Sequence, residues 1–426
     1  MATPFWYNAA LALIKPLYQS RIRKRAENPD LLKQELLERF GPFQPVKNLN
    51  AMWFHVVSVG ETNAAQPLIE HYLKAGHPVL VTNTTKTGQA RAQSLFLKEP
   101  YINLFQAVYL PADQKHLVRD FIEKYQPKLL ALVETELWPN LIDQAQQLHV
   151  PRLLINARLS EKSAKGYAKV ASLSRPMLQN LTQLLAQDQA TLARFIALGA
   201  KPELSQVVGS IKFDIHAPQH AVEQAAQLKI GWSLAARKIV TIASTHAPEE
   251  QKILSALKPY LQSHPELLCI VVPRHPERFD EVFVETQKLQ LRTQRRSLNQ
   301  AIQADTQVYL ADSMGELWQW LALSQACFVG GSLNEPGGGH NILEPIALNV
   351  PTLLGKNYFN FQTIVDEFAA VDAVKVVENA QQAAQVLVDL VQDLQKAQAL
   401  NAAAQLIMQN NTGSLQKHIQ VIDQYL

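Results

Sequence analysis

Short apolar runs that alternate with helical stretches dominate the pattern of this chain. In the first half these runs are 52–59, 79–82, 107–110, 128–133 and 152–155, and in the second half they are 239–243, 267–272, 307–310, 326–329 and 352–354. Their Val, Leu and Ile content is nearly continuous, which is typical of strands that are covered on both faces. The pattern therefore predicts parallel α/β sheets with helices on both sides.

The alternation lapses between residues 217 and 233, in a polar stretch rich in Ala and Gln. The length of 426 residues also exceeds one ordinary core, at about one domain per 150 residues. We therefore predict two Rossmann-like, doubly wound domains, over residues 26–220 and 221–426. The helical tail at about 380–426 is assigned to the second domain, and whether it crosses back to the first stays open.

The segment 1–25 differs from the rest in composition. Apolar residues recur at helical spacing, and a basic cluster follows them: Phe5, Trp6, Ala9, Ala10, Leu13, Ile14, Leu17 and Tyr18, then Arg21, Arg23, Lys24 and Arg25. The apolar stretch contains Lys15 and Pro16 and is shorter than the roughly 20 residues that span a bilayer. We expect an amphipathic helix that lies on an anionic membrane surface. The alternative is a first helix that packs on its own domain and has a solvated basic end.

Overall composition is that of a globular protein, with 47% apolar and 18% charged residues. A net charge of +3 is too small to indicate binding of nucleic acid. The two cysteines, Cys269 and Cys327, both lie inside apolar runs, so we expect buried free thiols and neither a disulfide nor a metal site.

Candidate chemistry in the first half consists of carboxylates at strand ends, where open α/β sheets bind ligands. Glu61 follows an apolar run and Gly60, although Ser58-x-x-Glu61 also matches a helix capping box. Glu134 and Glu136 close another run. Two residues apart in an extended chain, they would face the same side, where like charges resist joint ionisation.

The second half carries basic and glycine-rich segments at the corresponding positions. Arg274, His275 and Arg278 follow the run 267–272 and suit a phosphate or carboxylate, although they also fit a solvated loop. Gly337 to Asn341 is a glycine-rich start of a helix, where free N–H groups favour an anion. Further segments that follow strands are Ser244 to His246, Gly330 to Ser332 and 312–316. Hydrolase and metal motifs such as G-x-S-x-G, H-E-x-x-H and Walker A do not occur.

Taken together, these motifs resemble those of the Kdo transferases, which move 3-deoxy-D-manno-octulosonic acid (Kdo) from CMP-Kdo to lipid A precursor. The resemblance covers about residues 4–370, and its segments are His55 to Glu61, Glu134 to Asn140, Asn156 to Ser160, Gly209 to Asp214, Pro273 to Arg278, and Gly339 to Glu344. One departure is visible, because the link 333–337 is one residue longer than usual.

The resemblance implies a GT-B fold, with the acceptor in the first domain and the nucleotide sugar in the second. It implies that Glu61 is the general base and that Glu134 and Lys212 stabilise the transition state. The residues that it assigns to CMP binding are Arg274, His275, Ser313, Met314, Gly315, Glu316, Gly339, His340, Asn341, Ile342, Leu343 and Glu344.

The implied reaction is an inverting transfer of Kdo from CMP-Kdo to a hydroxyl of lipid A precursor (lipid IVA), during lipopolysaccharide core assembly in a Gram-negative cell. Because basic residues and a helix terminus can hold the CMP phosphate, we expect neither a metal nor another cofactor. The expected location is the cytoplasmic side of the inner membrane. Two alternatives stay open: a GT-B transferase or epimerase that uses a UDP-sugar, and a non-catalytic protein that binds lipid A.

Overall fold

The computed structural model describes residues 3–25 and 28–426. Residues 1–2 and 26–27, which fall in the predicted N-terminal segment and at the start of the predicted first domain, lie outside the described residues. The chain forms two compact units, Met1–Asp214 with Asn411–Leu426, and Ile215–Asn410. The predicted boundary at 220/221 falls inside helix α10, and the last residues, assigned above to the second domain, belong to the first unit.

The first unit is built on one parallel sheet of seven strands in the order β3-β2-β1-β4-β5-β6-β7. These are β1 (Met52–His55), β2 (Val79–Asn83), β3 (Phe105–Tyr109), β4 (Leu129–Val133), β5 (Arg152–Ala157), β6 (Gln183–Ala186) and β7 (Ser205–Val207). The predicted run 52–59 overshoots β1, because Ser58 caps the helix that begins at Val59. Strands β6 and β7, at one edge of the sheet, were not predicted.

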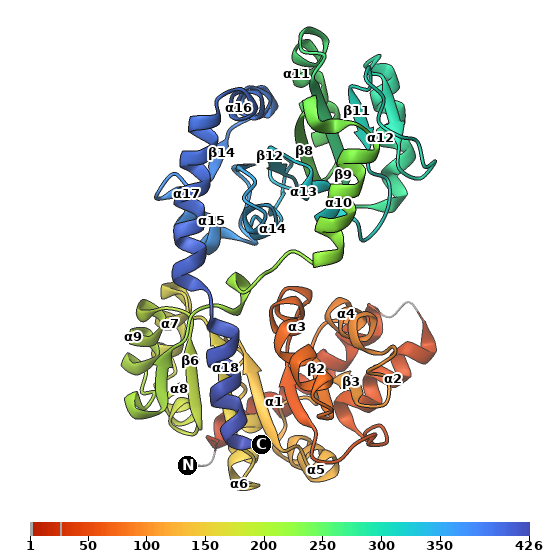
Figure 1. Cartoon of the computed structure of the whole chain (residues 1–426). Helices are drawn as coiled ribbons and strands as arrows, with labels where there is room; N and C mark the ends of the chain where they lie inside the picture. The colour runs from red at the N-terminus through yellow and green to blue at the C-terminus, as the bar shows by residue number, and fades with distance from the viewer. Residues whose placement is uncertain (1–2, 26–27) are drawn as a thin grey trace. The chain divides into compact units, whose positions relative to one another are not determined.

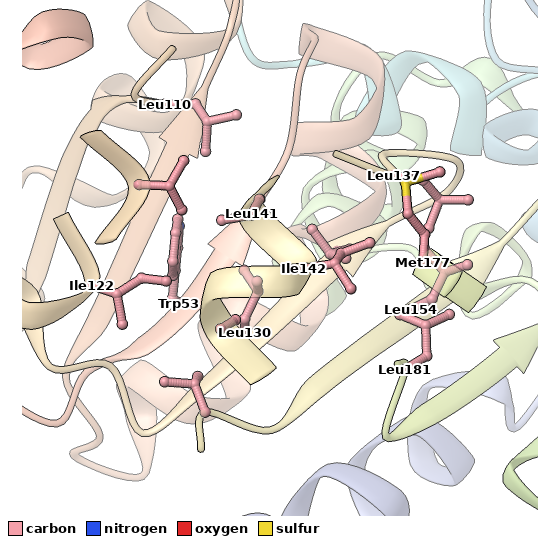
Figure 2. Packing of buried hydrophobic residues seen from close by; sticks show 14 of the residues in the cluster. Trp53, Leu110, Ile122, Leu130, Leu137, Leu141, Ile142, Leu154, Met177 and Leu181 are labelled. Atoms are coloured by element: carbon pink, nitrogen blue, oxygen red, sulfur yellow. The ribbon is translucent and has the colours of Figure 1, made fainter. Parts of the chain in front are cut away.

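Side chains of this sheet alternate between two cores, as a sheet covered on both faces requires. Trp53 of β1 and Leu130 of β4 pack on one face, whereas Phe54 and Leu129 pack on the other. Figure 2 shows the first of these cores, with Ile142 of α6 on the same face as Trp53 and Leu130. The runs are therefore apolar along their whole length because both faces of the strands are buried, as predicted from the sequence.

Helices of the first unit cover both faces of the sheet (Figure 1). They are α1 (Phe5–Lys24), α2 (Pro29–Phe40), α3 (Val59–Lys74), α4 (Lys86–Phe96), α5 (Lys115–Tyr125), α6 (Pro139–Gln147), α7 (Glu161–Lys169), α8 (Ala171–Gln179), α9 (Gln189–Ala197) and α18 (Ser414–Ile422). Ile419 and Ile422 of α18 belong to the same core as α3. The Asp214 carboxylate accepts hydrogen bonds from the N–H groups of Gly413 (2.6 Å) and Leu415, so it joins the two points where the chain passes between the units.

The second unit repeats this architecture with a parallel sheet in the order β10-β11-β9-β8-β12-β13-β14. Its strands are β8 (Lys238–Thr245), β9 (Leu267–Pro273), β10 (Thr293–Arg295), β11 (Val308–Leu310), β12 (Ala326–Val329), β13 (Thr352–Gly355) and β14 (Lys375–Val377). Its helices are α10 (Gln219–Gly231), α11 (Glu249–Ser263), α12 (Phe279–Lys288), α13 (Leu317–Ala322), α14 (Leu343–Ala347), α15 (Gln362–Ala369), α16 (Ala380–Gln392) and α17 (Leu394–Asn411). Cys269 and Cys327 are buried free thiols, as predicted.

Helix α1 has one side against its own unit and one side open. Ile22 is fully buried, and the Tyr7 hydroxyl donates to the Asp113 carboxylate over 2.8 Å. Large apolar residues nevertheless point outward, with Phe5 87%, Leu13 79% and Leu17 71% exposed. Among the described residues, none of the helices combines the length and apolar character needed to cross a membrane. The predicted helix is therefore present, and its attachment to a membrane stays a prediction.

Candidate active site

The Glu61 carboxylate lies where strand β1 passes into helix α3. Its Oε2 accepts a hydrogen bond from the Val57 N–H over 2.7 Å, and its Oε1 accepts one from the Ser58 hydroxyl over 3.2 Å. The Glu61 N–H in turn donates to Ser58 Oγ over 3.4 Å. The capping interaction that the sequence suggested is thus present, and it holds the carboxylate at the carboxyl edge of the sheet.

The protonation of Glu61 is shifted by its surroundings. Burial, followed by the nearby charges of Glu136 and Glu134, raises the pKa of Glu61 to about 7, although the hydrogen bond from Val57 opposes the shift. A carboxylate with a pKa near neutrality can take a proton from a hydroxyl more readily than an ordinary glutamate. Capping alone does not require such a shift.

Lys212 and Glu134 form an ion pair beside this carboxylate. The Lys212 ammonium donates to Glu134 Oε1 over 2.8 Å, although the two residues are far apart in sequence. Lys212 lies on a short 3-10 turn after β7, and Glu134 follows β4 with a positive φ of 60°. The turn at Glu134 means that the extended geometry inferred for Glu134 and Glu136 is wrong, because a left-handed residue changes the direction of the chain.

Glu136 has its own partners. Its Oε2 accepts a hydrogen bond from Trp138 Nε1 over 3.0 Å and lies 3.7 Å from Nε2 of His55. His55 is fully buried, and its Nδ1 lies 3.1 Å from the Thr82 carbonyl oxygen, which can only accept a hydrogen bond. The Thr82 hydroxyl oxygen lies 3.0 Å from the same nitrogen, and the ring presents Nε2 towards Glu136. The charges of Glu134 and Glu136 both raise the pKa of Glu61, so these three glutamates lie close together in the first unit.

In the second unit, Arg274 and His275 follow strand β9 as predicted. Arg274 is exposed, and among the described residues none of the carboxylates forms an ion pair with it. Arg278 differs, because its guanidinium donates to the buried Glu250 carboxylate over 2.7 Å and to Glu281. Of the two guanidiniums expected to be available for an anion, only that of Arg274 lacks a carboxylate partner within the described part of the chain.

Three histidines meet at this edge of the second sheet. His246 Nε2 lies 2.8 Å from His340 Nε2, and the ring centroids of His246 and His275 lie 4.8 Å apart. Burial, with the charges of His246, Arg274 and His275, lowers the pKa of His340 to about 4. A β-carbon on Gly331, whose φ is +67°, would lie 2.9 Å from the His340 ring, so this close approach requires glycine.

Asn341 and Glu344 lie in the same neighbourhood. The Asn341 side chain accepts a hydrogen bond from the Leu343 N–H over 3.1 Å at the start of the short helix α14. Burial raises the pKa of Glu344 to about 7, opposed by a hydrogen bond from Asn341 and by the charge of Arg274. Ile342 and Leu343 are buried and anchor this segment in the unit.

Glu249, which was not predicted as a site residue, binds backbone N–H groups of the glycine-rich segment that follows strand β12. The buried Glu249 carboxylate accepts hydrogen bonds from the N–H groups of Gly331 (2.7 Å), Ser332 (2.9 Å), Leu333 (2.8 Å) and His246 (2.9 Å). The amide donors of the first glycine turn are therefore already satisfied. Acidic residues in a first helical turn are common, so the sequence carried no signal for this contact.

The Ser313 to Glu316 turn follows strand β11, as predicted. The Glu316 carboxylate binds Arg296 through two contacts of 2.9 and 2.7 Å and also accepts from the Ser313 hydroxyl. The pairing with Arg296 lowers the pKa of Glu316. Met314 is 60% exposed and Gly315 has a φ of +84°, so the tip of the turn is open to a ligand whereas the Glu316 carboxylate is engaged.

Among the residues that the structure describes, groups of three or more His, Cys, Asp or Glu side chains that could hold a metal ion do not occur.

Comparison with known proteins decides the family. Residues 34–215 match the family described as 3-deoxy-D-manno-octulosonic-acid transferase (kdotransferase). The 3-deoxy-D-manno-octulosonic acid transferase of Haemophilus influenzae is 34% identical over 428 residues, which cover 99% of this chain and 98% of the relative. The chain belongs to the Kdo transferase family. The transferase of Bordetella pertussis covers 99% of both chains at 32% identity. The resemblance stated from sequence motifs is confirmed, and with it glycosyl transfer in lipopolysaccharide biosynthesis.

Solved structures show the fold of this Kdo transferase family member. HepE from Anabaena, in complex with UDP, covers 88% of this chain and 99% of its own at 14% identity, with a TM-score of 0.53. The UDP-GlcNAc 2-epimerase of Neisseria meningitidis covers 86% and 100% at 14% identity, with the same TM-score of 0.53. The C-terminal CMP-Kdo binding domain of WaaA from Acinetobacter baumannii is 61% identical over 45% of this chain and 100% of that chain, with a TM-score of 0.45. The likeness to HepE and to the epimerase confirms the predicted GT-B class.

Proposed function

We propose that this protein transfers Kdo from CMP-Kdo to a hydroxyl group of the lipid A precursor, with inversion at the anomeric carbon of Kdo. The observation that carries the proposal is the Glu61 carboxylate, held at a strand end with a pKa of about 7 beside the pair formed by Lys212 and Glu134. In a Kdo transferase such a group has the chemistry of a general base.

In this mechanism Glu61 takes the proton of the acceptor hydroxyl while the hydroxyl oxygen bonds to the anomeric carbon. The bond between that carbon and the phosphate oxygen of CMP breaks, and its electron pair leaves with CMP. Attack and departure on opposite faces of the carbon invert its configuration, as in inverting glycosidases. Lys212 supplies positive charge next to the base, and Glu134 orients the Lys212 ammonium through their 2.8 Å contact.

Donor binding is assigned to the second unit. Arg274 offers a guanidinium without a carboxylate partner among the described residues, which suits the phosphate of CMP or the carboxylate of Kdo. His340 and Glu344 lie close enough for the charge of Arg274 to shift their pKa values, and Glu344 suits the hydroxyl groups of a sugar. The Ser313 to Gly315 turn and the segment Gly339 to Leu343 complete the proposed CMP-Kdo site.

Acceptor binding and membrane attachment are assigned to the first unit. The exposed apolar side of α1, with Phe5, Leu13 and Leu17, and the basic end of the helix suit the cytoplasmic surface of an anionic inner membrane. The protein would then bind its lipid acceptor at the surface of the membrane that contains this lipid.

The decisive experiment is incubation of the full chain with CMP-Kdo and tetra-acylated lipid A precursor, with product detection by mass spectrometry. We expect a mass increase of one or more Kdo units and competition by CMP but not by UDP. Stronger competition by UDP would favour a UDP-sugar enzyme of the same fold. Acceptor binding without any mass increase would indicate a non-catalytic lipid A binder.

A further inference from the structure

An apolar cavity of about 260 Å³ lies inside the first unit beside helix α1. Its walls come from five parts of the chain: helix α1, the end of helix α2, and the segments that follow strands β2, β3 and β4. The lining includes Leu11, Ile14 and Tyr18 of α1, then Leu110, Ala112 and Trp138. The space is open to solvent on one side, so a ligand can enter it.

One side of the cavity continues into the outer surface of α1. Ile14 lines the cavity and is also 52% exposed, so the cavity reaches the face on which Leu13 and Leu17 stand open to solvent. This is the face that we assign to the membrane. The apolar lining of the cavity is thus continuous with apolar side chains on this face.

The other side of the cavity touches the catalytic loop. Trp138 lines the cavity and donates through Nε1 to the Glu136 carboxylate, which belongs to the same group as Glu61. Sheet order gives the same result, because Thr84 follows β2, Leu110 follows β3 and Trp138 lies after β4, whereas Glu61 follows β1 between β2 and β4. The carboxyl ends of parallel strands share one edge, so the cavity and the base are neighbours.

Of the three charged side chains that line the cavity, Asp113 and Arg39 already have partners within the protein, and the third has no carboxylate partner among the described residues. The Asp113 carboxylate accepts from Tyr7, Asn140 and Leu141, and Arg39 binds Glu35 and the Thr84 carbonyl oxygen. Lys15 is the exception, because its ammonium lies 5.6 Å from the centre of the Phe40 ring and, within the described ranges, pairs with none of the carboxylates. An apolar interior with a cation in its wall suits a hydrocarbon chain on an anionic molecule.

We propose that this cavity binds one fatty acyl chain of the lipid acceptor and thereby places the acceptor hydroxyl near Glu61. This inference rests on the proposed function, since it assumes that the acceptor is an acylated glycolipid. Size is in agreement, because an apolar cavity of about 150 Å³ takes up benzene, so one of about 260 Å³ takes up a longer hydrocarbon segment. Lys15 pairs with a phosphate or carboxylate of the same ligand.

A direct test uses dodecanoate brominated at its tail, below its micelle concentration, as a quencher of tryptophan fluorescence. We expect saturable quenching in the parent chain, and its loss in Trp138→Phe identifies Trp138 among the six tryptophans. Ala112→Phe, which fills the cavity, should weaken binding by about tenfold, whereas Leu49→Gln, on the surface before strand β1, should not. If Ala112→Phe does not fold, Leu11→Phe narrows the cavity from α1 instead. Quenching that does not saturate, or that survives in the filled variant, overturns the proposal.

A kinetic test compares two leucines of the first unit, Leu11 in the cavity wall and Leu49, which is 52% exposed and lies before strand β1 at the opposite edge of the sheet. With acceptor dispersed in detergent, Leu11→Gln should raise KM for acylated acceptor by about tenfold and leave kcat/KM for deacylated acceptor unchanged, because the amide is buried without a partner. Leu49→Gln should change neither. Equal effects of the two substitutions overturn the assignment to an acyl chain. If the protein shows saturable quenching but transfers Kdo to none of the acceptors, the proposed function is wrong. The cavity would then still be a binding site for a hydrocarbon chain.

Discussion

At the scale of single residues, Glu61 combines a structural and a chemical property. Its carboxylate accepts hydrogen bonds at the start of α3, and burial beside Glu136 and Glu134 raises its pKa to about 7. The hydrogen bonds fix the direction of the carboxylate, and the raised pKa makes it a stronger base. Loss of the hydrogen bonds should lower thermal stability, whereas loss of the base should lower kcat, so substitution of Glu61 separates the two roles.

Glu61→Gln should lower kcat by roughly 10²-fold or more, because an amide cannot accept the proton of the acceptor hydroxyl. Its oxygen can still accept one backbone hydrogen bond, so we expect only a small loss of thermal stability and unchanged CMP binding. Steady-state rates, thermal melting and titration with CMP check the three expectations. Turnover near that of the parent would leave Glu61 with its capping role alone.

The pH dependence of transfer should follow the ionisation of Glu61. Because the base acts only when deprotonated, kcat/KM should rise with pH through about 7 and fall as the carboxylate takes up a proton below that value. Rates of the parent chain between pH 5 and 9 provide the measurement, and the residual activity of Glu61→Gln serves as the control without this group. A rise centred near pH 4.5 in the parent would contradict the raised pKa.

At the scale of elements, the loop after β9 contains two arginines with different surroundings. Arg274 is exposed and lacks a carboxylate partner among the described residues, whereas Arg278 pairs with Glu250, whose side chain is fully buried. One loop thus offers one guanidinium to a ligand and uses the other to hold the loop on α11.

Arg274→Gln should raise the KM for CMP-Kdo by about tenfold or more while thermal stability stays close to that of the parent, because only a charge-assisted contact with the donor is lost. Arg278→Gln is the matched control. It leaves the buried Glu250 carboxylate unpaired, at a cost of about 3–5 kcal/mol in the free energy of unfolding. Donor kinetics and thermal melting of both variants test this, and the reverse pattern would show that the ligand arginine was misassigned.

At the scale of the whole molecule, membrane binding depends on α1 and its basic end. The Arg25 guanidinium forms an ion pair with Glu35, which is only 2% exposed, so Arg25 also holds the helix on its unit. A variant designed to test the membrane should therefore keep Arg25 and change the other three basic residues.

Replacing Arg21, Arg23 and Lys24 with Ser should weaken binding to anionic vesicles, since each basic residue contributes about 1 kcal/mol near such a surface. In the parent, binding should weaken with salt and leave a hydrophobic component. Transfer to acceptor in detergent should be retained. Vesicle sedimentation over a range of salt concentrations measures the effect, and equal binding by parent and variant at every salt concentration would refute an electrostatic anchor.

Metal removal tests the chemistry of the whole reaction. With phosphate charge met by Arg274 and with Lys212 beside the base, we expect transfer to continue in excess EDTA. Activity that disappears on chelation and returns with Mg²⁺ would place a metal ion in the reaction, with Glu134 and Glu136 as its first candidate ligands.

Local pattern was sufficient to predict the strands at the centre of each sheet and to place the candidate site residues at strand ends. Runs such as 128–133 and 267–272 became β4 and β9, because a strand buried on both faces must be apolar along its length. The strands that escaped prediction, β6, β7, β10 and β14, lie towards or at sheet edges, where fewer apolar residues are required. Glu61, Glu134 and Arg274 were found because parallel strands bring their carboxyl ends to one edge.

The sequence by itself therefore determined the two α/β units, the family and the carboxyl ends at which the site residues stand. Only the tertiary structure decided which of these groups are free to act. Glu249 satisfies the amides of Gly331 to Leu333 across more than 80 positions of sequence, and Lys212 finds Glu134 across 78. The cavity beside α1 likewise needs five separate segments of the chain. The hydrophobic periodicity of a sequence indicates whether a residue is buried. Its hydrogen-bond or ion-pair partner depends on which distant segment the fold places beside it.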